Sequence, residues 1–195
     1  MLKRLFDIVF SIIGLIVLFP LFIIIAILIK FDSRGPVLFF QKRVGKSAKL
    51  FTLIKFRSMY INHDNTSTVS IDGENRVTLV GKWLRKSKLD ELPELWNVLN
   101  GDMSFVGPRP DVPGYADKLK GDARDILKIR PGITGPASIK YFDEEIILST
   151  KDNPQNYNDK VIYPDKVRLN LEYYHNNNIF KDIKIIFATI FRIRY

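Results

Sequence analysis

The sequence predicts an α+β protein that is mostly helical, with an N-terminal membrane hairpin and a compact domain containing a few short strands and amphipathic interfacial helices. Residues 8–29 are almost wholly apolar, whereas later residues mix apolar and charged types as a soluble domain does. Two short Phe-rich segments are typical of strands, and several others repeat apolar residues every three or four positions, as helices do. We therefore divide the chain into a re-entrant membrane helix, residues 1–30, and a cytoplasmic domain, residues 31–195.

The apolar segment contains features that favour a hairpin over a straight span. Its length would cross a bilayer, but Pro20 interrupts it, and proline breaks or kinks a helix. Lys3 and Arg4 precede the segment, and Lys30 and Arg34 follow it. Because basic flanks prefer the cytoplasm, a helix–break–helix with both ends inside satisfies both flanks. A Pro-kinked spanning helix remains the alternative, whereas a signal peptide fits poorly because no small-residue cleavage site follows.

The first half of the domain is expected to combine a strand pair with two short helices. Residues 37–41 and 50–56 are predicted strands, joined by a basic turn over residues 42–49. Residues 62–75 are polar and predict an exposed loop, and residues 81–86 predict a short helix. Apolar residues at i, i+3, i+4 and i+7 predict a helix over residues 92–99, ended by Asn100-Gly101.

The second half is expected to alternate loops and helices. Residues 104–113 and 130–136 are rich in Pro and Gly and predict loops, and residues 151–159 predict a polar loop. Helices are expected over residues 122–129, 141–150, 165–175 and 179–192. The last one carries isoleucines spaced by three and four residues together with basic residues. Such a helix could pack on the core or lie on anionic lipid, and both remain open.

Composition narrows the kind of partner. The formal net charge is +9, so the chain is expected to bind anions. The apolar segment favours membrane lipids and phosphorylated substrates over nucleic acid. Because the chain has no Cys, disulfides, thiolate metal sites and Cys nucleophiles are excluded, and with only two His a multi-His metal site is not expected.

An acid pair among basic loops is the strongest chemical signal. Asp90 and Glu91 directly precede the helix predicted over residues 92–99, and a helix N-terminus stabilises carboxylates and attracts phosphate. Arg109 lies in a stiff Gly-Pro-Arg-Pro loop, Arg130 opens a second Arg-Pro-Gly loop, and Lys55 lies in a third basic segment. A simple charged helix start would explain the acid pair alone. Several cationic loops around it predict a site for a pyrophosphate.

These residues carry a resemblance to a known family. KFRSM (55–59), LRKSKLDELPELWNVLNGDMSFVGPRP (84–110) and RPGITG (130–135) resemble the bacterial sugar transferases, the monotopic polyprenyl-phosphate phosphoglycosyl transferases. The similarity extends over nearly the whole chain in order, and the long central motif is highly specific. The chain resembles the small members, which consist of little more than the catalytic unit.

The resemblance implies a reaction and its site. Asp90 would attack the β-phosphate of a UDP-sugar, release UMP and hold the phospho-sugar covalently, and polyprenyl (undecaprenyl) phosphate would then accept it. Mg²⁺ would be held by Glu91 and Asp90. The enzyme would act at the cytoplasmic face of the bacterial inner membrane, in the first membrane step of O-antigen, capsule or glycoprotein glycan synthesis, and a homodimer is allowed. Further substrate or phosphate contacts are expected from Lys55, Arg85, Arg109, Pro110, Arg130 and Asp165.

The sequence departs from the family pattern at three places. The Ser-Pro pair that breaks the membrane helix is Phe19-Pro20 here, Asn170 stands where the family usually has Asp, and Asn177-Asn178 replaces a Trp-Ser pair. The residues that select the sugar are expected within two variable segments, residues 62–75 and 142–163.

Three rival functions are weighed against this interpretation. The polytopic phosphoglycosyl transferases need many spans, and this chain has one apolar segment. An ordinary glycosyltransferase would release UDP instead of UMP. A non-catalytic basic membrane-surface protein would explain the charge and the apolar segment, but not the acid pair or the two Arg-Pro-Gly loops.

Overall fold

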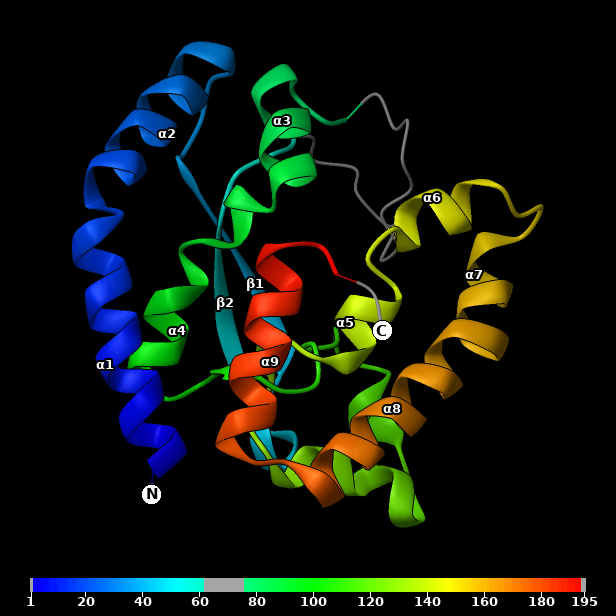
Figure 1. Cartoon of the computed structure of the whole chain (residues 1–195). Coiled ribbons are helices and arrows are strands. Elements are labelled where there is room, and N and C mark those ends of the chain that lie inside the picture. Colours follow the sequence, from blue (N-terminus) through cyan, green and yellow to red (C-terminus); the bar gives the residue numbers. More distant parts are fainter. Residues whose placement is uncertain (1, 62–75, 194–195) are drawn as a thin grey trace.

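A computed structural model describes residues 2–61 and 76–193 (Figure 1). The chain is mostly helical with a few short strands, as the sequence predicts. The loop predicted over residues 62–75 lies outside the described residues. Two long N-terminal helices run along one side of the molecule, and the remaining elements pack beside them.

The N-terminal apolar segment forms two helices, α1 (Leu2–Val17) and α2 (Phe19–Asp32), bent by 59° at the break between them. Pro20 lies in the first turn of α2, where its missing N–H costs no helical hydrogen bond. Among the described residues no single helix has the length and apolarity to cross a membrane. The bent pair meets that requirement by length and composition only.

Helix α1 attaches to the rest of the molecule through a polar face. The buried carboxylate of Asp7 accepts hydrogen bonds from Ser104 Oγ and from the Phe105 N–H, both at 3.1 Å. Lys3 Nζ lies 2.6 Å from Asp182 Oδ2 near the other end of the chain. Because Ile16 on the same helix is 68% exposed, α1 presents polar groups to the protein and apolar groups to the outside.

The two predicted strands form an antiparallel hairpin, β1 (Leu38–Val44) and β2 (Leu50–Phe56). β1 continues to Val44, so the turn predicted over residues 42–49 is shorter than expected and consists mainly of the 3₁₀ turn Lys46–Ala48. The side-chain amide of Asn97 holds the helical region that comes later in the chain against this hairpin. It accepts from the Ile54 N–H at 3.0 Å and donates to the Thr52 carbonyl at 2.8 Å.

Three short helices follow, α3 (Leu79–Ser87), η2 (Leu89–Glu91) and α4 (Glu94–Asn100). Thr78 caps α3, and Lys88 adopts a left-handed conformation that ends it. The helix predicted over residues 92–99 is confirmed with a shift of one or two residues. Gly101 ends α4 with φ +92°, a conformation that favours glycine.

The two segments predicted as Pro/Gly loops also contain short strands. β3 (Ser104–Val106) and β4 (Gly132–Thr134) pair in parallel. The two chain segments pass so closely that a Cβ atom on Gly107 would lie 2.3 Å from the Arg130 carbonyl oxygen. The glycines, which by pattern predict loops, therefore permit this close approach of the two segments.

The second half is helical, and one prediction there is wrong. The polar segment 151–159 is expected as a loop, but it contains α7 and the start of a π-helical turn, because the Asn153 side chain caps the Asn156 N–H at 3.0 Å. The elements are η3 (Ala116–Lys118), η4 (Gly121–Lys128), α5 (Pro136–Lys140), α6 (Glu144–Ser149), α7 (Pro154–Tyr157), η5 (Asn158–Ile162), α8 (Tyr163–Asn176) and α9 (Ile179–Ile190).

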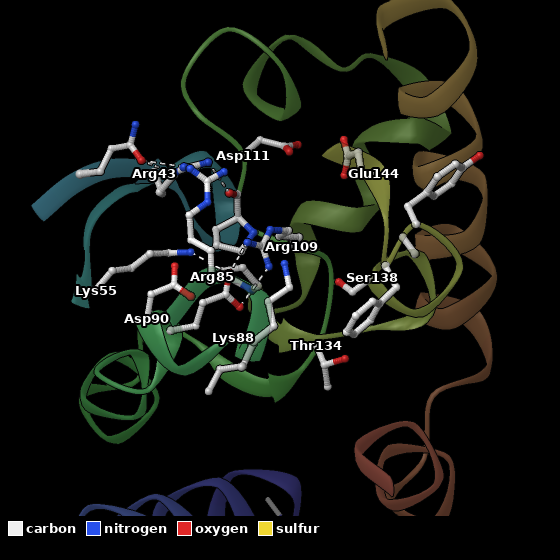
Figure 2. A pocket seen from close by; sticks show the side chains of 18 of the residues that line it. Arg43, Lys55, Arg85, Lys88, Asp90, Arg109, Asp111, Thr134, Ser138 and Glu144 are labelled. Atoms are coloured by element: carbon white, nitrogen blue, oxygen red, sulfur yellow. Dashed lines mark hydrogen bonds and ion pairs between the residues drawn. The ribbon is translucent and has the colours of Figure 1, made fainter. Parts of the chain in front are cut away.

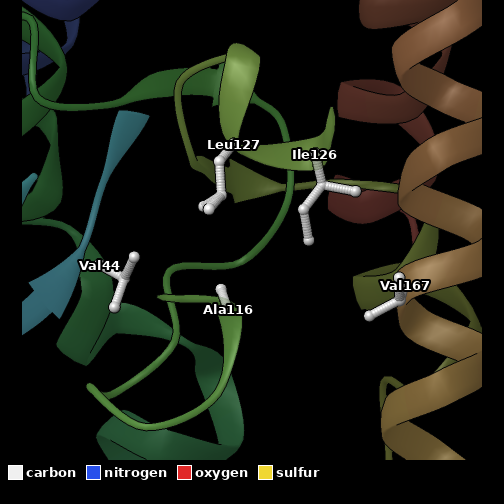
Figure 3. Packing of buried hydrophobic residues seen from close by; sticks show 5 residues of the cluster. All are labelled: Val44, Ala116, Ile126, Leu127 and Val167. Atoms are coloured by element: carbon white, nitrogen blue, oxygen red, sulfur yellow. The ribbon is translucent and has the colours of Figure 1, made fainter. Parts of the chain in front are cut away.

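Small hydrophobic clusters join these elements. One cluster links β1, η3, η4 and α8 through Val44, Ala116, Ile126, Leu127 and Val167 (Figure 3). Helix α9 buries Ile185 in another cluster, whereas Phe180 on the same helix is 81% exposed. The last helix therefore packs on the core with one face and leaves an apolar face open.

Candidate active site

A cavity of about 1600 Å³ lies between the strand hairpin, the acid pair and helices α5, α6 and α8 (Figure 2). Pockets for one small ligand span roughly 300–1,000 Å³, so this cavity has room for more than one substrate. Its wall includes most of the predicted site residues, namely Lys55, Arg85, Asp90, Glu91, Arg109 and Pro110.

The acid pair lies in the 3₁₀ turn η2, and not directly before the helix α4 as the sequence predicts. Asp90 and Glu91 are 8% and 7% exposed. The turn starts at the left-handed Lys88 and is separated from α4 by Leu92 and Pro93. The pair is therefore held between α3 and α4, and not at the first turn of α4.

Glu91 is neutralised on two sides. Its Oε1 lies 2.8 Å from Lys55 Nζ, and Arg109 binds both carboxylate oxygens, with the Nη1–Oε2 distance at 3.3 Å. Burial alone would raise the pKa of Glu91, but Arg109 and Lys55 outweigh it and hold the pKa well below its usual range. Glu91 is therefore an anion that fixes two cations on the cavity wall.

Glu94, which was not among the predicted site residues, belongs to the same cluster. It is buried, and its Oε1 lies 3.1 Å from Lys55 Nζ. Burial, together with the nearby Glu91 charge, raises the pKa of Glu94 to about 7. Its spacing of three residues from Glu91 was the available signal, since both then lie on one side of a helical turn.

Asp90 differs from its neighbours because it has a free acceptor. Its Oδ1 is buried and forms no hydrogen bond. Burial and the Glu91 charge raise the pKa of Asp90 above its usual value. Figure 2 shows Asp90 beside Lys55 on the cavity wall. A desolvated carboxylate oxygen next to cations can act as a nucleophile or as a metal ligand.

Two other cations reach the cavity. Arg43, which the sequence places only in a basic turn, projects from β1 and donates to the Pro110 carbonyl at 3.1 Å and to Gln41 Oε1 at 2.6 Å. Burial and the neighbouring Arg109 lower the pKa of Arg43 to about 10. Arg85 lines the cavity but pairs with Glu145 of α6, not with the acid pair.

The structure places Arg130 and Asp165 outside the cavity lining. Arg130 Nε donates to the Gly101 carbonyl at 2.7 Å, just beyond the end of α4. Asp165 accepts from Lys140 Nζ at 2.7 Å, from the Tyr141 hydroxyl at 2.8 Å and from Arg168. Because Tyr141 does line the cavity, Asp165 can act there only through its neighbours.

The acid pair supplies carboxylate oxygens, the ligand type that a magnesium ion bound together with a substrate would use. Within residues 2–61 and 76–193, no group of three His, Asp or Glu side chains is arranged to hold a metal. Mg²⁺ commonly uses one or two carboxylates plus phosphate oxygens and water. Asp90 Oδ1 forms no hydrogen bond, whereas the Glu91 oxygens are shared with Arg109 and Lys55.

Comparison with known proteins identifies the family. A sequence model described as bacterial sugar transferase matches residues 1–194. The chain is 40% identical, over 97% of its length, to an undecaprenyl-phosphate glucose phosphotransferase of Komagataeibacter xylinus, and covers 35% of that protein. It is 36% identical to a UDP-glucose:undecaprenyl-phosphate glucose-1-phosphate transferase of Escherichia coli, over 98% of this chain and 40% of the relative.

A shorter relative is matched over most of its own length. The exopolysaccharide production protein ExoY of Sinorhizobium fredii is 34% identical, over 96% of this chain and 83% of the relative. By contrast, the chain spans about two fifths of the longer relatives. The family model spans the acid pair and the basic loops that surround the cavity, and the chain belongs to the bacterial sugar transferase family.

Proposed function

We propose that this chain transfers a phospho-sugar from a UDP-sugar to polyprenyl (undecaprenyl) phosphate and releases UMP. The observation that carries this proposal is the free, buried Asp90 Oδ1 on the wall of a cavity lined by Lys55, Arg43 and Arg109. The names of the relatives support the class of donor and acceptor. The reaction would begin the assembly of a membrane-linked glycan.

The proposed first step forms an aspartyl phospho-sugar. Asp90 Oδ1 attacks the β-phosphorus of the donor, and the bond from that phosphorus to the bridging oxygen breaks. UMP leaves with the bonding electron pair. Arg109 and Lys55 are already fixed by Glu91, so they can neutralise developing charge on phosphate oxygens without reorganising.

The proposed second step regenerates the enzyme. A phosphate oxygen of the acceptor attacks the same phosphorus, and the bond to Asp90 breaks. The products are a polyprenyl-diphosphate sugar and a free carboxylate. Splitting one displacement into two lets the same cationic wall serve both substrates in turn.

Magnesium has a defined place in this proposal. Glu91 and the second carboxylate oxygen of Asp90 would hold Mg²⁺ together with substrate oxygens, so that Asp90 Oδ1 stays available as the nucleophile, and the ion would supply additional neutralisation of phosphate charge. Removing Mg²⁺ with a chelator is expected to stop turnover, and full activity in chelator would remove the ion from the scheme.

The N-terminal helices are proposed to enter one leaflet from the cytoplasmic side of the bacterial inner membrane. The bend between α1 and α2 and their exposed apolar side chains support this, as do the basic residues at both ends. Cysteines placed at Leu2 and Lys46 are expected to resist a membrane-impermeant reagent added outside intact cells. Labelling at one of them alone would indicate a spanning helix.

The decisive experiment is nucleotide release by the purified full chain in detergent. With the right UDP-sugar we expect UMP, stoichiometric with enzyme without acceptor and catalytic with undecaprenyl phosphate. Asp90→Asn should lower turnover by a factor on the order of 10³ or more and keep the thermal unfolding midpoint, since it removes the nucleophile and preserves shape. UDP release would indicate an ordinary glycosyltransferase.

A non-catalytic membrane-surface protein is the second candidate. The open apolar faces and the net charge of +9 favour it. Such a protein would bind anionic vesicles equally well with and without the Asp90→Asn substitution. Equal vesicle binding by the two proteins, together with no nucleotide release by the wild type, would therefore support it.

A further inference from the structure

Several buried polar side-chain atoms that form no hydrogen bond belong to residues of the same cavity wall. Among the described residues, four buried side-chain nitrogen or oxygen atoms form no hydrogen bond, and all four belong to residues that line this cavity. Leaving such an atom unpaired is destabilising, so these atoms are rare in native proteins and point to a function. They are Arg57 Nε, Asp90 Oδ1, Ser138 Oγ and Asn170 Oδ1.

Two of the four belong to residues that have another role. Asp90 Oδ1 is the proposed nucleophile. Arg57 donates through its other two nitrogens to the Ser33 and Arg34 carbonyls and so ties the end of α2 to the hairpin. Ser138 and Asn170 have no role in the proposed chemistry.

Ser138 and Asn170 lie on neighbouring elements. Ser138 is on α5 and Asn170 is on α8, and these two helices are in contact. Asn170 is only 6% exposed, so its amide is held in place by packing. Figure 2 shows Ser138 across the cavity from Asp90. Ser138 therefore faces a ligand whose reacting phosphate is at Asp90, and Asn170 lines the same cavity.

The chemistry of the two cavity walls differs. The wall near Asp90 carries Lys55, Arg43 and Arg109, which suit phosphate oxygens. Ser138 and Asn170 are uncharged. An amide oxygen accepts hydrogen bonds only, so a phosphate oxygen cannot satisfy Asn170 Oδ1, whereas a hydroxyl or an amide N–H can.

We infer that Ser138 and Asn170 form a subsite for the uncharged part of the nucleotide-sugar, where Asn170 accepts a hydrogen bond from a ligand O–H or N–H group. This inference rests on the proposed function for the identity of the donor. The ligand group belongs either to the sugar, as a ring hydroxyl or acylamino N–H, or to the uracil ring. Both present the same donor chemistry, and experiment can separate them.

The test measures binding, so it does not depend on turnover. The full chain in detergent is titrated calorimetrically with a panel of UDP-sugars and with UMP, comparing wild type, Ser138→Ala and Asn170→Leu. Asn176→Leu is the matched control, because Asn176 lies on the same helix, is exposed and, among the residues that the structure describes, its side chain bonds only the Glu172 carbonyl. Asn170→Leu removes an unpaired buried oxygen, so its thermal midpoint should not fall, and Ser138→Ala removes a single oxygen.

Both site variants are expected to weaken UDP-sugar binding about 10-fold, which corresponds to about 1.4 kcal/mol. If the contact is with the sugar, UMP affinity stays unchanged and the loss differs between epimeric donors. If the contact is with uracil, UMP affinity falls by the same factor. Affinities for all donors and UMP within about 2-fold of the wild type would overturn the inference, and continued UMP release by the wild type would show that the proposed function still stands.

Discussion

Two loops of nearly the same composition have different roles. Arg109 and Arg130 each lie beside proline and glycine, and the two loops touch, since the Gly132 N–H donates to the Pro108 carbonyl at 2.8 Å. Arg109 turns to the buried carboxylate of Glu91 in the cavity. Arg130 turns to the Gly101 carbonyl beyond the end of α4.

The different roles of Arg109 and Arg130 follow from the group that each guanidinium contacts, and not from the composition of its loop. A guanidinium paired with a buried carboxylate in a cavity remains close to any phosphate that enters. A guanidinium at a helix C-terminus satisfies carbonyls that the helix leaves unpaired and favours the helix dipole. Arg4 does the same for the Val98 and Leu99 carbonyls, so this end of α4 is held by two arginines.

Within the comparison of the two loops, removing Arg109 should have the largest effect. Arg109→Ala leaves Glu91 paired with Lys55 alone and removes a phosphate contact, so we expect kcat/KM for UMP release to fall on the order of 10²–10³-fold. Arg109→Lys should restore part of it, because it keeps the charge but loses the two-pronged contact. If Arg109→Ala lowers kcat/KM by less than about 3-fold, Arg109 does not take part in the reaction.

The cluster around Arg109 should also make stability depend on pH. The pKa of Glu94 is about 7, above its ordinary value of 4.5. Between these values the unfolded chain ionises first, so this group's contribution to stability falls as pH rises from about 4.5 to 7, by about 3 kcal/mol. The difference between the thermal midpoints at the two ends of this pH range should therefore be smaller for Glu94→Gln than for the wild type. Identical pH dependence in both proteins would contradict the shift.

Removing Arg130 should have the smallest effect and a different kind. Arg130→Ala loses one charged hydrogen bond to a helix end, so we expect a stability loss of about 1–2 kcal/mol, visible as a lower thermal midpoint. The kcat/KM of Arg130→Ala should stay within about 3-fold of the wild-type value. A large loss of kcat/KM without a change in the midpoint would instead place Arg130 in substrate binding and remove the distinction between the two loops.

The sequence predicted the elements better than the partners of their side chains. Local signals were sufficient for the strand hairpin, for α4 and for the last helix, since periodicity and caps act over a few residues. The pairing of β3 with β4 was missed because each strand has three residues and joins segments 28 positions apart. Arg43 and Glu94 were missed for a related reason: their place in the cavity depends on contacts between distant segments, which no local pattern records.

The attachment of α1 has a consequence for how the chain folds. Lys3 and Asp182 are separated by 179 positions, and Asp7 and Ser104 by 97. During synthesis the first helix therefore emerges long before the groups that pair with its polar face. Closing contacts of such high sequence separation is slow because of loop-closure entropy. The docking of α1 is therefore expected to be completed only after α9 has left the ribosome, and truncation before Asp182 should remove the Lys3 ion pair while the contacts of Arg4 and Asp7 with earlier residues remain.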